Sequence, residues 1–175
     1  MSEAALYHIR EGVGSPPILF VHGYLCGFDN WRYQIDHFAP SNTVLACDLR
    51  GLGKTPRLGG EMSIGQMGRD IADLIALYDL RNTVLVGHSM GCRVIMEAFR
   101  QAKPRVAGLV LIDGSRGGTS GGPDQAKFDK EIADNSYREF VEALFEGMFF
   151  GEHPDWKETL LASVFAVPEE IGKPL

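Results

Sequence analysis

Short runs of apolar residues recur along the first two thirds of the chain, separated by segments with helical periodicity. Four of these runs are nearly unbroken: Ile18–Val21, Thr43–Cys47, Thr83–Val86 and Val106–Ile112. A strand buried on both faces of a parallel sheet has this continuous pattern, whereas a half-exposed strand alternates apolar and polar residues. The pattern therefore predicts four buried strands, and Leu6–Arg10 predicts a further short strand before them.

Helical spacing fills the segments between the runs. A helix is predicted over residues 29–39, where Asp29 or Asn30 can cap its start. Residues 63–66 match a capping box, and apolar residues follow at intervals of three and four up to Tyr78. Another helix is predicted over residues 90–101. This alternation of strand and helix predicts an α/β fold built on a parallel, doubly wound sheet with right-handed crossovers.

The composition changes after Asp113. Residues 114–123 are rich in glycine and serine, as in a flexible connector. Beyond them, helical patterns cover about residues 125–150 and 156–167. We therefore divide the chain into an N-terminal core, residues 1–114, and a connector followed by helices, residues 115–175.

The overall composition, with 45% hydrophobic and 23% charged residues, is that of an ordinary globular protein. A net charge of −6 argues against nucleic acid or an anionic membrane as a partner. No apolar run approaches the roughly 20 residues of a membrane-spanning helix, and the first residues lack a signal-peptide pattern. Three widely spaced cysteines favour reduced thiols in the cytoplasm over disulfides or a metal site.

The pentapeptide Gly87-His88-Ser89-Met90-Gly91 stands between a predicted strand and a predicted helix. This context is typical of a nucleophile elbow, a sharp turn that exposes one serine. Glycines on both sides of the serine allow the strand and the helix to approach each other, because glycine has no Cβ. Ser89 is therefore the candidate nucleophile.

An activated serine also requires donors for the oxyanion that forms during acyl transfer. The amide of Met90 lies at the start of a helix, where free N–H groups and the helix dipole favour negative charge. The second donor is expected in the loop after the first buried strand, at the amide of Tyr24. Both loops follow the carboxyl ends of parallel strands, where ligands bind in such folds. We expect Gly23, Trp31 and His88 to border the substrate there.

Four segments together resemble the α/β-hydrolase superfamily, in particular its branch of esterases, cofactor-free haloperoxidases and C–C bond hydrolases. They are His22-Gly23-Tyr24, Asp48-Leu49-Arg50-Gly51-Leu52-Gly53, Gly87-His88-Ser89-Met90-Gly91 and Leu109-Val110-Leu111-Ile112-Asp113. The resemblance covers about residues 6–114 in the order of the family. It implies Ser89 as the nucleophile, the amides of Tyr24 and Met90 as oxyanion donors, no cofactor, and a helical cap after the strand at 106–112.

The family usually places an acid after the next strand of the sheet and a histidine after the last one, and neither segment is recognisable here. A less common arrangement puts the acid at the end of the strand that finishes at Asp113, which makes Asp113 a candidate acid. The other interpretation of Asp113 is a strand-end residue that orients nearby loops. The usual sheet order would put the strand at 106–112 beside the strands that are not recognisable here. Without them it would be an exposed apolar edge through which chains could associate. We therefore expect the chain to be part of a longer protein and to be nearly inactive alone.

Several residues near the predicted site have simpler interpretations. His22 and His88 are interpreted as structural, with His22 bracing the oxyanion loop, and His153 is a weaker alternative base. Asp48 is interpreted as a turn-forming residue. Residues 53–55 end like a phosphate-binding loop, but Asp48 occupies the position of a required glycine, which argues against nucleotide binding.

The sequence thus predicts a serine hydrolase for a small or medium, rather apolar ester or related acyl compound, with this small molecule as its expected partner. A hydrolase-fold protein that binds a ligand without turnover is the first alternative. Lyase or perhydrolase chemistry on the same fold is the second, since a fold does not determine a reaction.

Overall fold

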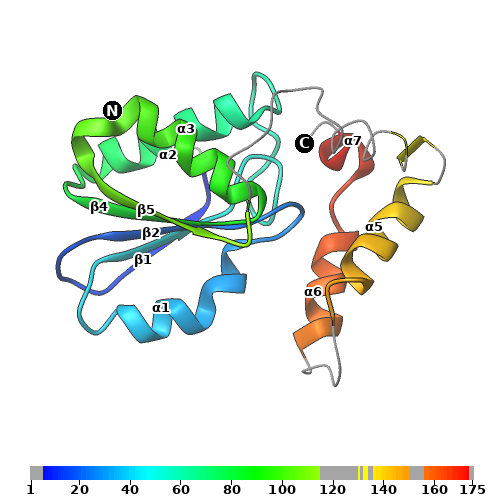
Figure 1. The fold of residues 1–175 in the computed structure, drawn as a ribbon, viewed down its shortest axis with the longest axis horizontal. Coiled ribbons are helices and arrows are strands. Elements are labelled where there is room, and N and C mark those ends of the chain that lie inside the picture. Colours follow the sequence, from blue (N-terminus) through cyan, green and yellow to red (C-terminus); the bar gives the residue numbers. More distant parts are fainter. Residues whose placement is uncertain (1–5, 115–129, 131, 134–135, 150–155, 174–175) are drawn as a thin grey trace.

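The computed structural model describes residues 6–114, 130, 132–133, 136–149 and 156–173. Figure 1 shows the sheet with its helices and, beside it, a group of C-terminal helices. The elements are β1 (His8–Glu11), β2 (Ile18–Val21), the 3-10 turn η1 (Phe28–Trp31), α1 (Arg32–Phe38), β3 (Val44–Cys47), α2 (Ile64–Leu77), β4 (Thr83–His88), α3 (Met90–Ala102), the 3-10 turn η2 (Lys103–Arg105), β5 (Val106–Ile112), α5 (Tyr137–Glu146), α6 (Trp156–Phe165) and α7 (Glu169–Gly172).

The five strands form one sheet in the order β1-β3-β2-β4-β5. Strands β2 to β5 run parallel to their neighbours, with Ile18 opposite both Val44 and Val84. The predicted α/β fold is thereby confirmed. β1 is the exception, because it pairs antiparallel with β3. Residues 12–17, which join β1 to β2, are too few for the crossover of roughly a dozen residues that a parallel connection needs.

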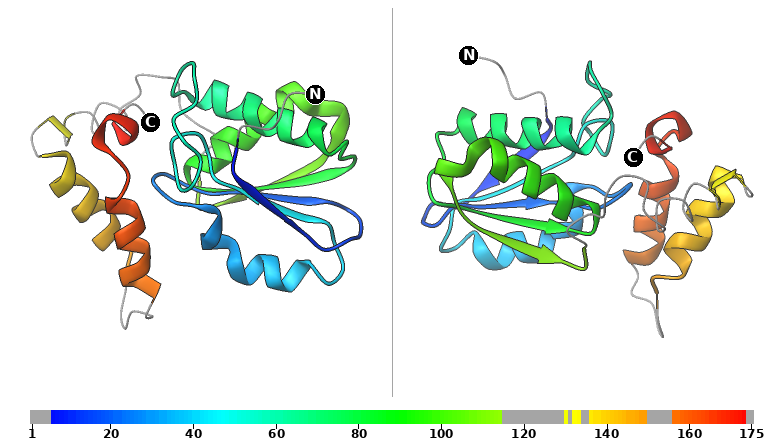
Figure 2. Two further views of the ribbon diagram at one scale, coloured as in Figure 1. Left: turned by 180° about the vertical axis from the view of Figure 1, so that it is seen from behind. Right: turned by 45° about the horizontal axis from the view of Figure 1, so that its top comes forward.

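Helices α2 and α3 cover one face of the sheet and α1 covers the other (Figures 1 and 2). Neighbouring residues of one strand point to opposite faces. Leu19 of β2 therefore joins the core under α2 and α3, whereas Phe20 joins the cluster under α1. Both residues are buried, which explains why the central strands have unbroken apolar runs.

Local hydrogen bonds decide where the helices begin. Ser63 caps α2 by accepting a hydrogen bond from the amide of Gln66, which is one half of the predicted capping box. The side chain of Gln66 instead bonds Asp70 and Arg69. The helix predicted over 29–39 differs, because η1 (Phe28–Trp31) comes first and α1 begins only after it. Asn30 does not cap an α-helix. Its side chain accepts from the amide of Gly27 and completes the start of the 3-10 turn.

Helices α5, α6 and α7 lie together next to the loops at one end of the sheet (Figure 1). α5 starts with a reciprocal capping box between Ser136 and Glu139 and is shorter than the helix predicted over 125–150. Residues 125–129 of that prediction lie outside the described part, as does the predicted connector beyond Gly114. α6 confirms the second predicted helix, and Pro168 stands between it and α7.

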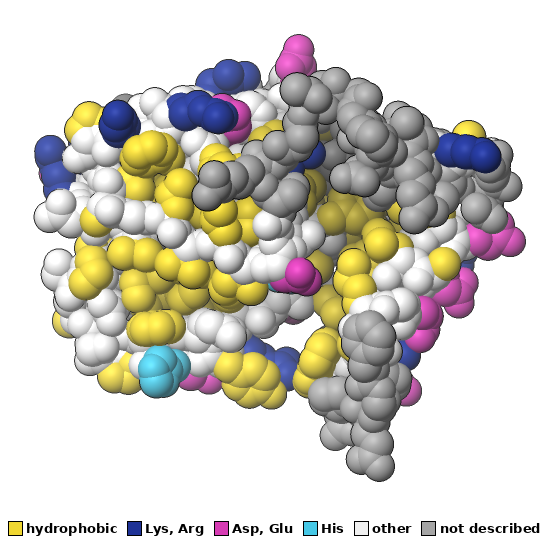
Figure 3. Space-filling view, viewed as in Figure 1, with side chains coloured by type: hydrophobic (Ala, Val, Ile, Leu, Met, Phe, Trp, Pro, Cys, Tyr) yellow, Lys and Arg dark blue, Asp and Glu magenta, His cyan; other side chains and the backbone are white. Residues whose placement is uncertain are grey.

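β5 forms one edge of the sheet, and its last residues are exposed although they are apolar. Val110, Leu111 and Ile112 are 44%, 38% and 40% exposed. In the space-filling view, hydrophobic side chains gather over the sheet on the side drawn (Figure 3). No strand among the described residues pairs with the outer edge of β5, as the sequence predicted.

Candidate active site

The candidate nucleophile lies at the turn between β4 and α3. Ser89 has φ 50° and ψ −117°, a backbone conformation that residues with a Cβ rarely adopt. Its amide donates to the carbonyl of Ile112 at 2.9 Å, which ties the turn to the end of β5. The backbone thus has the sharp, strained geometry that the pentapeptide predicts.

Two glycines make this turn sterically feasible. A Cβ on Gly87 would lie 2.6 Å from the carbonyl oxygen of Gly91. A Cβ on Gly91 would lie 2.5 Å from the carbonyl oxygen of Val21 and 2.6 Å from that of His22. The first glycine lets β4 and α3 approach each other, and the second lets α3 begin against the end of β2.

The loop after β2 reaches the serine directly. A Cβ on Gly23 would lie 3.2 Å from Cβ of Ser89 and 3.1 Å from Nδ1 of His88. Tyr24 follows in this loop, and Met90 is the first residue of α3, where N–H groups lack a helical acceptor and carry the positive end of the dipole. The two segments that carry the candidate oxyanion amides therefore meet at Ser89.

His22 is buried and links two loops. Its Nε2 accepts a hydrogen bond from the amide of Leu49 at 3.0 Å. Because a backbone amide is always the donor, the ring proton resides on Nδ1, which donates to the carbonyl of Gly23 at 2.8 Å. Burial lowers the pKa of the imidazole and favours this neutral form. With both nitrogens engaged, His22 links the loop after β2 to the loop after β3 and is not free to act as a base.

His88 and Asp113 approach the turn from the ends of β4 and β5. Burial lowers the pKa of His88, an effect that the negative charge of Asp113 only partly opposes. Asp113 is exposed and has φ 45°. In the described part of the chain, no hydrogen bond joins a histidine to the hydroxyl of Ser89 or to the carboxylate of Asp113. The candidate acid thus lies at the carboxyl end of β5, as expected, and no Ser–His–acid chain is complete among the described residues.

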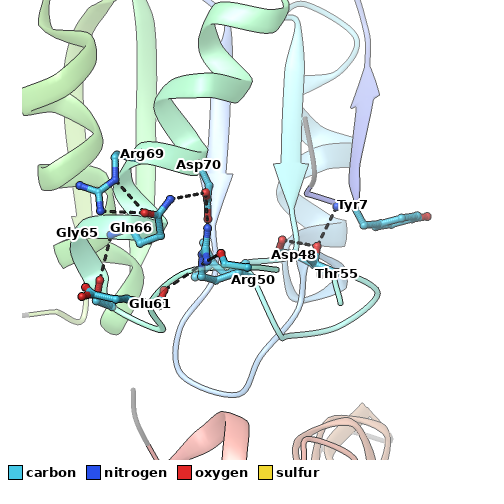
Figure 4. Close-up of polar contacts among 12 residues, drawn as sticks. Tyr7, Asp48, Arg50, Thr55, Glu61, Gly65, Gln66, Arg69 and Asp70 are labelled. Carbon is cyan, nitrogen blue, oxygen red and sulfur yellow. Dashed lines mark hydrogen bonds and ion pairs between the residues drawn. The ribbon is translucent and has the colours of Figure 1, made fainter. Parts of the chain in front are cut away.

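Asp48 organises the loop that follows β3. Its Oδ1 accepts from the amide of Phe28 at 2.7 Å and its Oδ2 from the amide of Lys54 at 2.8 Å. Its carbonyl accepts from the hydroxyl of Thr55, which in turn accepts from the amide of Tyr7 (Figure 4). Asp48 is therefore a turn-forming residue, as interpreted from the sequence.

A buried ion pair joins the same loop to α2, and no pattern in the sequence predicts it. Arg50, which is 2% exposed, donates to both carboxylate oxygens of Asp70 on α2, each at 2.7 Å (Figure 4). Its remaining amino group donates to the carbonyls of Gly59 and Glu61. The side chain of Gln66 also donates to Asp70. This network fixes the loop after β3 to α2.

The sequence profile of a family described as alpha/beta hydrolase fold matches residues 16–169, which is most of the chain. The chain belongs to the α/β-hydrolase fold family. This assignment agrees with the sheet order and with the strand–turn–helix geometry around Ser89.

Known proteins similar to this α/β hydrolase have several activities. The dihydrolipoyllysine-residue acetyltransferase component of the acetoin cleaving system of Cupriavidus necator is 35% identical over 106 residues, 60% of this chain and 28% of that protein. Epoxide hydrolase 1 of Caenorhabditis elegans is 28% identical over 166 residues, 93% of this chain and 38% of that protein. A thermophilic esterase structure from Thermogutta terrifontis matches 95% of this chain and 64% of its own, with 26% identity and a TM-score of 0.79. The chain thus spans less than half the length of these two curated relatives.

Among the residues expected to border the substrate of this α/β hydrolase, Trp31 is packed into the core. It is 5% exposed in the cluster under α1, with its ring centroid 4.9 Å from that of Phe20. This burial favours core packing, so substrate contact by Trp31 stays a prediction. Gly23 and His88, in contrast, lie next to Ser89.

Outside the turn at Ser89, the cysteines and other titratable groups of this α/β hydrolase give little indication of further chemistry. All three cysteines are free thiols, and burial raises the pKa of Cys26 to about 12. The described segments contain no cluster of three His, Cys, Asp or Glu side chains suited to a metal ion. None of the described helices combines the length and apolar content needed to cross a bilayer. His153, the alternative base, lies outside the described residues.

Proposed function

We propose that this α/β hydrolase is a serine hydrolase in which Ser89 attacks the carbonyl of a small or medium, rather apolar ester or related acyl compound. The observation that carries the proposal is the strained backbone of Ser89 between two sterically required glycines. A non-glycine residue in such a conformation costs about 1–3 kcal/mol, and such strain concentrates at functional sites. The similarity to an esterase of known structure supports acyl transfer as the reaction.

In the proposed mechanism, Oγ of Ser89 adds to the acyl carbonyl and the carbonyl oxygen becomes an oxyanion. The amides of Tyr24 and Met90 donate to this oxygen. Collapse of the tetrahedral intermediate expels the alcohol and leaves an acyl-serine, which water then hydrolyses. No cofactor takes part in these steps.

A general base must accept the proton of Ser89 and return it to the leaving group. His22 is unsuitable because both of its nitrogens hold loops in place. His88 has no hydrogen bond to Ser89. We therefore assign the base to a histidine other than these two, and we assign Asp113 as the acid that orients it.

The apolar character of the substrate is inferred from the surroundings of the elbow. The side chains of Tyr24 and Met90 pack against an apolar cluster that continues into α5 through Phe140 and Phe145. A charged acyl group would lose its hydration in such surroundings without a compensating partner. The free thiols support a cytoplasmic location for the protein.

Hydrolysis of p-nitrophenyl butyrate tests this proposal. We expect the 175-residue chain to act far more slowly than ordinary esterases, since losing a base or an oxyanion donor costs a factor of about 10² or more. The Ser89→Ala variant should be slower still, whereas Ser41→Ala, an exposed turn serine, should match the wild type. Equal rates for the wild type and Ser89→Ala would contradict Ser89 as the nucleophile. Turnover at the level of ordinary esterases would contradict the need for a further histidine.

A ligand-binding role without turnover is the second candidate. It is favoured by the absence of a hydrogen bond between a histidine and Ser89 among the described residues. Binding of an apolar ester with no release of product by the wild type would support this candidate. Lyase or perhydrolase chemistry would be recognised by its products.

A further inference from the structure

Two hydroxyl groups connect the oxyanion loop to the C-terminal helices. Oη of Tyr24 lies 3.2 Å from Oη of Tyr137 on α5 and 3.2 Å from the carbonyl oxygen of Gly172 at the end of α7. A carbonyl can only accept, so Tyr24 donates its one proton to Gly172, and Tyr137 donates to Tyr24. One side chain of the loop thus binds two helices that are separate in the sequence.

The junction is closely packed around this pair of hydroxyls. A Cβ on Gly172 would overlap the hydroxyl of Tyr137 and would lie 3.1 Å from Cδ2 of Leu25. In the neighbouring loop, a Cβ on Gly51 would lie 2.9 Å from Cγ2 of Ile171. α7 is therefore fitted against the loops that follow both β2 and β3.

The oxyanion loop also contains a strained backbone position. Leu25, the residue after Tyr24, has φ 55°, which is unfavourable for a side chain of this type. Burial raises the pKa of both tyrosine hydroxyls, so both stay protonated and able to donate over the ordinary pH range. Loss of these protons therefore does not break the hydrogen bonds over the ordinary pH range.

We propose that Tyr24 is a positioning residue whose hydroxyl, held by Tyr137 and Gly172, fixes the oxyanion loop beside Ser89. The seating of α5 and α7 then controls the reactivity of the serine. The backbone amide of Tyr24 is itself the proposed oxyanion donor, so a movement of this side chain displaces the donor directly. The inference rests on the proposed function of Ser89.

Hydrogen–deuterium exchange of the amides of residues 23–27 tests the coupling without requiring activity. Tyr137→Phe removes one hydroxyl and keeps the ring. Loss of an ordinary hydrogen bond changes a local opening equilibrium by about fivefold, so exchange in the loop should rise by about that factor. Tyr33→Phe changes an exposed tyrosine of α1 and should leave the loop unchanged. Equal exchange in Tyr137→Phe and the wild type would overturn the proposal.

The kinetics of Ser89 labelling by a fluorophosphonate test the consequence for the site. In Tyr24→Phe, which keeps the backbone amide, the maximal labelling rate should fall about fivefold. The reagent concentration at half-maximal rate should stay the same, because positioning affects the reacting step. A lower melting temperature with an unchanged labelling rate would reduce the tyrosine pair to a structural role and overturn the proposal. If even the wild type forms no Ser89 adduct, the proposed function fails, and the exchange experiment still decides the coupling.

Discussion

At the scale of single residues, the geometry around Ser89 depends on positions where only a hydrogen atom fits. Gly91→Ala would place a methyl group 2.5 Å from the carbonyl oxygen of Val21. Because the clashing atom belongs to the backbone, it cannot move aside as the end of a flexible side chain can. We therefore expect the free energy of unfolding, measured with urea, to decrease by about 1–3 kcal/mol or more. Gly65→Ala in α2 meets no atom within 4 Å and should be neutral or stabilising. Similar losses in both variants would contradict this account of the turn.

The buried imidazole of His22 predicts a dependence of stability on pH. Its pKa is lowered in the folded protein, whereas in the unfolded chain histidine titrates near about 6.5. As the pH falls through that value, the unfolded state binds a proton that the folded state does not. The free energy of unfolding therefore decreases as the pH is lowered, by at most about 1.4 kcal/mol per pH unit from this group.

His22→Asn should show a smaller decrease in the free energy of unfolding between pH 7.5 and pH 5.5 than the wild type. This range brackets the pKa of unfolded histidine, about 6.5. His37→Asn, at an exposed position of α1, should keep the slope of the wild type. An unchanged slope in His22→Asn would mean that the lowered pKa does not contribute to stability. Urea unfolding at a series of pH values measures all three proteins.

Residues with local signals could be predicted, whereas residues with distant partners could not. Ser89 was found because glycine spacing and a strand–helix context surround it in the sequence. The role of Trp31 could not be predicted from the sequence, because an aromatic residue near a loop fits a core as well as a pocket, and its burial in the cluster under α1 comes from packing. The hydrogen-bond partners of Tyr24 and Arg50 lie on other elements of the fold, so no sequence pattern around either residue predicts them.

At the scale of elements, the Arg50–Asp70 pair determines how the loop after β3 is held. Asp70→Asn would leave a buried guanidinium without its counter-ion, a change that typically costs about 3–5 kcal/mol. Asp73→Asn, at an exposed position of the same helix, should change stability by about 0.5 kcal/mol or less. Urea unfolding of the two variants makes the comparison. Equal stabilities would show that the carbonyls of Gly59 and Glu61 suffice to hold the arginine.

The strands were predicted more closely than the helices. The unbroken apolar runs predicted the first and last residues of β2 and β5 correctly, because polar residues or turns mark both ends of each run. The direction of β1 was missed, although the short connection to β2 already ruled out a crossover. The late start of α1 follows from the hydrogen bond between Gly27 and Asn30, which a capping rule for α-helices does not anticipate.

At the scale of the whole molecule, the apolar edge of β5 predicts self-association of this chain. Two β5 strands that pair antiparallel about a two-fold axis would continue the sheet and cover Val110, Leu111 and Ile112. We expect sedimentation velocity to show a larger species that grows with concentration. Val110→Lys should reduce it, because a charge on an edge strand opposes pairing. A chain that stays monomeric at all concentrations would contradict the prediction.

The central claim is that Ser89 is the nucleophile, and intact-mass analysis after treatment with a fluorophosphonate tests it most directly. Because the chain is expected to lack its base, the account predicts that a single adduct forms on the wild-type chain far more slowly than on ordinary esterases, is lost in Ser89→Ala and is retained in Ser41→Ala. A folded wild-type chain that gains no adduct, or a Ser89→Ala variant that still gains one, would contradict the claim.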